Sequence, residues 1–240
     1  MTEHSFKPPD ALLRAIAQDL KPVKPAPRPK QLAIRMAALA CLISPLAVLA
    51  IGARPDASRM GPLLTWAASA AEFALAITLV WIAARESTPA KRLPRMVIHA
   101  ALTTALTIVV VTTFLTYRVS PENEGLRLSR LHALETILPA NVTPWVMAAA
   151  CAVGSTMMGG VLILIFSMVF RNSLANRPAV AGLLYGAGAG LAINASWRIA
   201  CPISTPLHAL GAHGVAIVAT ALLGAWIGQV QEKRWRKTQS

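Results

Sequence analysis

Residues 179–208, AVAGLLYGAGAGLAINASWRIACPISTPLH, contain the pattern that decides the fold. An apolar run without a charged residue extends from Ala179 to Trp197, and a second run begins at Leu207. The short segment between them is polar and carries Arg198 and Cys201, and His208 follows at the start of the second run. Apolar runs of this length are typical of helices that cross a lipid bilayer. The stretch therefore predicts two membrane helices joined by a short polar loop.

The rest of the chain repeats this pattern. Hydrophobic residues make up 55% of the sequence and charged residues only 14%, and the mean hydropathy is +0.54, values outside the range of soluble globular proteins. We predict an all-α polytopic integral membrane protein with six transmembrane helices, of which Pro45 kinks the first. The predicted helices span about 32–53, 62–84, 96–117, 145–170, 179–197 and 207–230. They form one membrane domain, 32–230, between a soluble segment, 1–31, and a basic tail, 231–240.

The distribution of positive charge predicts the orientation of these helices. Cytoplasmic loops of membrane proteins carry an excess of Lys and Arg. Both termini should therefore be cytoplasmic, and the net charge of +13 reflects this topology rather than a surface that binds nucleic acid. Of the 23 lysines and arginines, the opposite side has only Arg54, Arg59, Arg118, Arg127, Arg130 and Arg198.

The N-terminal segment carries a short amphipathic pattern. Its apolar residues Leu12, Leu13, Ile16 and Leu20 recur at helical spacing after Asp10, which is a suitable N-cap. The proline-rich, basic residues 21–29 cannot continue the helix and predict an extended spacer. The helix either lies on the bilayer surface or docks a cytoplasmic partner.

Small residues predict close packing of the fifth helix. Gly182, Gly186 and Gly190 recur every four residues, which allows helices to approach closely. The ridge predicts packing within the bundle, with a dimer contact or a conformational switch as alternatives. The fourth helix also carries glycines, and a groove formed by them would place the helix of Cys151 beside the helix that leads to Cys201. These glycines are Gly154, Gly159 and Gly160.

Glu72 is the only acidic residue deep within a predicted membrane helix. A carboxyl group there must be protonated, be paired, or face an internal polar cavity. His99 and Asn194 are partners by residue type. The alternatives are a structural hydrogen bond and a proton or ion pathway, and the second would indicate a small transporter.

The three cysteines differ in their surroundings. Cys41 lies in the middle of an apolar run, where a thiol behaves as a small hydrophobe. Cys151 and Cys201 lie toward the same side of the membrane, the oxidising side, where disulfides persist. They are expected to be unpaired, to form a redox-active pair, or to bind a thiophilic metal together with His208 or His213. The CxxC motif typical of thiol oxidoreductases is absent from the sequence.

Motifs of familiar soluble enzymes are also absent. The sequence has no Walker loop, dinucleotide-binding glycine fingerprint, HExxH motif or nucleophile elbow. We therefore expect a protein that is not an enzyme and has no small-molecule substrate.

Several segments together resemble the NrsF family of inner-membrane anti-sigma factors, which restrain sigma factors of the extracytoplasmic-function class. The resemblance extends over nearly the whole chain and includes the six apolar runs. It rests on ALLRAIAQDL at 11–20 with the following Lys-Pro tract, GARPD at 52–56 and CPISTPL at 201–207.

The resemblance implies a location in a bacterial inner membrane, a function and site residues. Cys151 and Cys201 match the two characteristic cysteines of the family, which are thought to sense heavy metals or oxidative stress, whereas Cys41 matches neither. It implies that a cytoplasmic face, for which we expect Leu12, Leu13, Ile16 and Leu20, holds the sigma factor until the cysteines are modified. We expect no cofactor apart from a transient thiophilic metal ion on Cys151, Cys201 and His208. The alternative functions are a small transporter and a membrane thiol oxidoreductase.

Overall fold

The computed structural model describes residues 9–12, 14, 28–54, 56–88, 92–120, 144–170 and 177–237, and the regular structure in these ranges is helical. Within these ranges, six helices are long and apolar enough to cross a membrane, which confirms the predicted all-α fold with six candidate transmembrane helices. They span Pro29–Ala50, Ala57–Glu86, Arg95–Val119, Trp145–Phe170, Pro178–Ala200 and Pro206–Arg234.

Prolines and glycines interrupt the first two spans. The first breaks at Pro45, as predicted, into α2 (Pro29–Ile43) and α3 (Leu46–Ile51). The second begins at Ala57, earlier than the predicted Pro62, because α4 (Ala57–Pro62) and the π-helical η1 (Leu63–Ala67) lead into α5 (Ala68–Glu86). The sequence pattern missed α4 because it is too polar to extend an apolar run.

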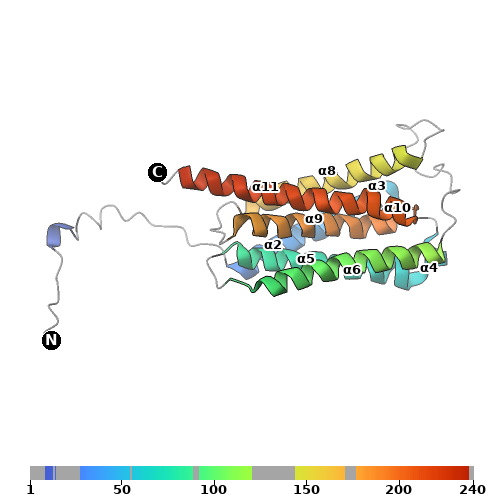
Figure 1. Ribbon diagram of the computed structural model, residues 1–240, viewed down its shortest axis with the longest axis horizontal. Helices are drawn as coiled ribbons and strands as arrows, with labels where there is room; N and C mark the ends of the chain where they lie inside the picture. The colour runs from blue at the N-terminus through green and yellow to red at the C-terminus, as the bar shows by residue number, and fades with distance from the viewer. Residues whose placement is uncertain are drawn as a thin grey trace.

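The remaining elements are α6 (Arg95–Val119), α8 (Pro144–Phe170), α9 (Pro178–Ala200), α10 (Pro206–His208), the π-helical η3 (Ala209–Gly214) and α11 (Val215–Lys237). The long helices lie side by side along the long axis of the molecule, and α2 begins at the end where α11 finishes (Figure 1). We call this the terminal end. The opposite end, where α9 finishes and α10 begins, is the cysteine end.

Helix α9 lies at the centre of the bundle. Its apolar window is 83% buried, and it packs against α5, α8 and α11. The glycine ridge faces α11, since a methyl group on Gly182 or Gly186 would overlap the carbonyl oxygen of Gly224 or Thr220 respectively. The prediction that the glycines of α8 form the facing groove holds only at Gly159, whose added Cβ would lie 3.8 Å from the Gly190 Cα, and α8 does lie beside α9, as that prediction implied. The groove opposite Gly182 and Gly186 belongs to α11. Helix α11 fills that position because its own Gly224 lets the two backbones meet.

The outer surface of the bundle carries large apolar side chains. Soluble proteins rarely expose such contiguous apolar surface, whereas a lipid bilayer solvates it. The apolar outer faces of the bundle are therefore consistent with six helices that cross a bilayer. Residues more than 70% exposed include Leu42, Leu49, Leu63, Trp145 and Leu207.

A partly buried ion pair joins three helices at the terminal end. Arg177, just before α9, lies 2.8 Å from Glu86, the last residue of α5, through Nη2 and Oε2. The same carboxylate accepts a hydrogen bond from the Leu93 amide at 2.9 Å, and Arg177 donates to the Leu93 carbonyl at 3.1 Å. The start of α9 is thereby attached to the end of α5 and to the segment that leads into α6.

Candidate functional site

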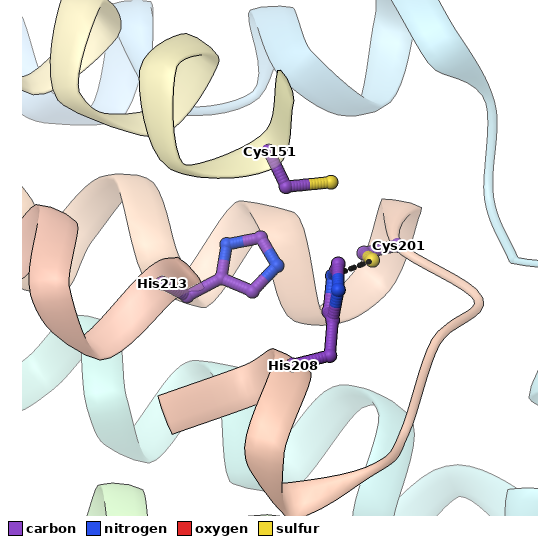
Figure 2. A group of neighbouring side chains, drawn as sticks. All are labelled: Cys151, Cys201, His208 and His213. Atoms are coloured by element: carbon purple, nitrogen blue, oxygen red, sulfur yellow. Dashed lines mark hydrogen bonds between the residues drawn. The ribbon is translucent and has the colours of Figure 1, made fainter. Parts of the chain in front are cut away.

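Four buried side chains gather at the cysteine end. They are Cys151, Cys201, His208 and His213, and the ligand atom that each offers lies within 4.8 Å of the other three. The side chains point toward one another across the space between α8, the end of α9 and η3 (Figure 2). Both cysteines are free thiols. The structure thus brings together Cys151, Cys201 and His208, and it adds His213, which the sequence offered only as an alternative ligand.

Local sequence explains the position of Cys201. It is the C-cap of α9, and its amide donates to the carbonyl of Trp197 at 2.6 Å. A residue that precedes proline disfavours the helical conformation, and Pro202 follows directly. Cys201 accordingly has extended backbone angles, φ −77° and ψ 121°. The helix ends at this residue, and the thiol remains buried beside Cys151 of α8.

A π-helical segment aligns the two histidines. Residues five apart in an α-helix lie about 140° apart around its axis, on different faces. A π-helix bonds each residue to the one five positions on, and such segments are frequent at functional sites. Because η3 follows His208 directly, the rings of His208 and His213 meet edge to face, with centroids 5.3 Å apart. A sequence analysis that assumes regular α-helical periodicity therefore places the two histidines on different faces and misses this pair.

Hydrogen bonds orient the cluster. Cys201 Sγ lies 3.4 Å from His208 Nε2. His213 Nδ1 lies 3.1 Å from Ser155 Oγ, one helical turn beyond Cys151 on α8. The hydrogen bond from Cys151 lowers the pKa of the Cys201 thiol, and the two imidazoles act in the same direction, against burial, which raises it. The cluster therefore favours Cys201 as the thiolate, the form that attacks oxidants and binds metals.

The segment at 52–56 holds the loop that follows Cys201. Arg54 and Asp56 form a buried ion pair, with Nε and Oδ1 2.6 Å apart. Arg54 Nη2 also donates to Ser204 Oγ at 2.5 Å and to the Pro202 carbonyl at 3.3 Å. Two segments of the resemblance, GARPD and CPISTPL, are therefore one structural unit, in which the guanidinium group fixes the loop against the bundle.

A second polar group lies deeper in the bundle, around Glu72. Its carboxylate accepts hydrogen bonds from Thr112 Oγ1 at 2.9 Å and Asn194 Nδ2 at 2.7 Å. Arg198 Nε lies 3.3 Å from Glu72 Oε1, which forms a buried ion pair. Of the two partners proposed by residue type, Asn194 is correct, whereas His99 is exposed. Saturation by three partners favours a structural role for this carboxylate over an ion pathway.

A small cavity connects the two polar groups. Its volume is about 30 Å³, enough for two or three water molecules, since one water needs about 10–15 Å³ on this scale. Asn194 and Arg198 line it beside the Glu72 group, and Cys201 and His213 line it beside the cluster. The surroundings of Cys201 are therefore continuous with the buried charges of the bundle.

The other predicted site residues lie elsewhere. Leu12 is 49% exposed, and Leu13, Ile16 and Leu20 lie outside the described residues. Cys41 is exposed on α2 and is not part of the cluster, in agreement with its expected separation from the other two cysteines.

Comparison with known proteins identifies the family. Searches of curated proteins and of solved structures return no match. A family model described as NrsF, negative regulator of sigma F, matches residues 16–235 and therefore nearly the whole chain. The match includes α2 through most of α11, the four clustered side chains and the Arg54 loop contact. The chain belongs to the NrsF family of negative regulators of a sigma factor.

Proposed function

We propose that this protein is an inner-membrane anti-sigma factor that holds a sigma factor of the extracytoplasmic-function class at the cytoplasmic face. Heavy metals or oxidants act on Cys151 and Cys201, with His208 as a third ligand for a metal, and the sigma factor is released. The protein acts by binding rather than by catalysis. The membership of residues 16–235 in a family of sigma-factor regulators is the observation that carries this proposal.

The arrangement of charge and apolar surface supports the proposed topology. The six candidate spans carry apolar outer faces, and the terminal end of α11 carries Arg234, Arg236 and Lys237. Positive charge favours the cytoplasmic side. The terminal end would then meet the sigma factor, while the cysteine end would face the compartment from which metals and oxidants arrive.

Helix α9 offers a direct physical connection between these ends. It begins beside the Glu86–Arg177 ion pair and finishes at Cys201, about 34 Å away at 1.5 Å per residue. A change at the cluster can shift binding at the other end only if the two states differ in affinity for the sigma factor. A 100-fold release needs a coupling free energy of about 2.7 kcal/mol, comparable to the net effect of one or two buried hydrogen bonds.

Co-purification tests whether the N-terminal stripe binds a sigma factor. Full-length protein in detergent, kept reduced and free of added metal, should retain the sigma factor. Combined substitution of Leu12, Leu13, Ile16 and Leu20 by serine should abolish retention because it removes the apolar face. The matched control Gln18→Ser, at a polar position of the same segment, should retain it. Failure of the unmodified protein to bind any sigma factor would contradict the function, and retention by the stripe variant would contradict the binding site.

A further inference from the structure

We propose that Cys151, Cys201, His208 and His213 form a closed four-ligand site for one divalent ion of the zinc and cadmium type. Two thiolates and two imidazoles are a common donor set of closed tetrahedral zinc sites. The role of this site in sensing rests on the function proposed above. The ability of the site to bind a metal is argued from geometry. The inference adds His213 as a fourth ligand to the metal site of the proposed function.

The distances between the donor atoms fit a tetrahedral ion. Bonds of 2.0–2.3 Å around such an ion separate the donor atoms by roughly 3.3–3.8 Å. The Cys201 Sγ to His208 Nε2 distance of 3.4 Å is already in this range. No pair of donor atoms in the cluster is more than 4.8 Å apart, so small side-chain rotations suffice to close the site. The backbone elements can stay where they are.

The environment of His213 indicates a ligand. Its Nε2 atom is buried and has no hydrogen-bond partner among the described residues, although leaving a buried polar atom unpaired is costly. Its Nδ1 atom lies 3.1 Å from Ser155 Oγ. Histidines that bind metals usually donate their other ring nitrogen to a neighbouring acceptor, which fixes the tautomer. With the Nδ1 proton directed at Ser155, Nε2 offers its lone pair to the centre of the cluster.

The charge balance selects the class of ion. A divalent cation with two thiolates and two neutral imidazoles has no net charge, which suits a buried site because isolated buried charges are strongly unfavourable. The nearby cations Arg54 and Arg198 are already matched by Asp56 and Glu72. A monovalent copper ion would leave one negative charge, and Mg²⁺ and Ca²⁺ need oxygen ligands that this cluster lacks.

Cobalt(II) spectroscopy on the full-length protein in detergent tests the site. Metal-free protein should bind one equivalent of Co²⁺ with a thiolate charge-transfer band and the intense visible bands of tetrahedral cobalt, and Zn²⁺ should displace it. His213→Ala and His208→Ala should each weaken binding more than about 100-fold, since even the loss of a residue that only orients a ligand typically costs 10- to 100-fold. The matched controls His99→Ala, an exposed histidine on α6, and Cys41→Ser should bind as the unmodified protein does.

X-ray absorption at the zinc edge tests the site in the unmodified protein, so the result does not depend on whether the variants fold. The unmodified protein should show two sulfur neighbours near 2.3 Å and two nitrogen neighbours near 2.0–2.1 Å. Absence of stoichiometric binding, a different set of neighbours, or binding unchanged in folded histidine variants would overturn the four-ligand site. Co-purification of the sigma factor in the same preparations separates the two proposals, because a protein that holds its sigma factor but binds no metal contradicts only the metal site.

Discussion

At the scale of single residues, buried charges in this bundle are matched within a few ångströms. Glu72 faces Arg198, Asp56 faces Arg54 and Glu86 faces Arg177, and all three carboxylates are almost fully buried. A buried pair contributes little net stability, but removal of one partner leaves an uncompensated charge. These residues therefore fix which side chains lie opposite one another rather than strengthen the fold as a whole.

The Glu72 group gives a prediction about stability. Glu72→Ala should lower the free energy of unfolding by about 3–5 kcal/mol, because Arg198 would stay buried without its carboxylate. The control Glu232→Ala removes a surface pair with Arg236 and should cost less than about 1 kcal/mol. Thermal unfolding in detergent measures both. Equal midpoints for the two variants would contradict the structural role of Glu72, and Glu72→Gln combined with Arg198→Met should recover much of the loss.

At the scale of helices, the close contact between α9 and α11 organises the bundle. Three glycines of α9 leave no room for a side chain toward α11, which brings the two backbones together. This contact aligns Cys201 at the end of α9 with the histidines that precede α11. The packing of two helices therefore determines the geometry of the candidate site.

A methyl group at the centre of this contact should be destabilising. Gly186→Ala would place its Cβ against the Thr220 carbonyl, a backbone atom that cannot rotate away, and should cost about 1–3 kcal/mol. The control Gly160→Ala on α8 finds only an ordinary contact, 3.9 Å from a Leu223 methyl group, and should be neutral or slightly stabilising. Thermal unfolding of both variants measures the difference. An unchanged midpoint for Gly186→Ala would contradict the close α9–α11 contact.

The sequence predicted the positions of the helices along the chain better than it predicted which helices pack against each other. Long apolar runs indicate spans without reference to the rest of the fold, so all six were found. A glycine ridge, by contrast, shows that another helix comes close but not which one. Here α11 faces all three glycines of the ridge, whereas of the α8 glycines Gly159 approaches it, at Gly190. The predicted topology was enough to place Cys151 and Cys201 at the same side of the membrane. The position of His213 depends on the π-helical η3, which no periodic pattern in the sequence indicates.

At the scale of the whole molecule, the proposed function needs communication between two ends of one bundle. Thiols and imidazoles gather at the cysteine end, and the chain enters and leaves the bundle at the terminal end (Figure 1). Helix α9 contacts α5, α8 and α11 along its buried length. A change in the cluster therefore reaches most of the bundle through one central helix.

Release of the sigma factor on exposure to Cd²⁺ is the most direct measurement of this coupling. Full-length protein with bound sigma factor should release most of it when Cd²⁺ is added, and so should Cys41→Ser. The double variant Cys151→Ser and Cys201→Ser should keep the sigma factor bound, because the ion then has no thiolates to bind at the cysteine end. Equal release from the double variant and the unmodified protein would contradict the account.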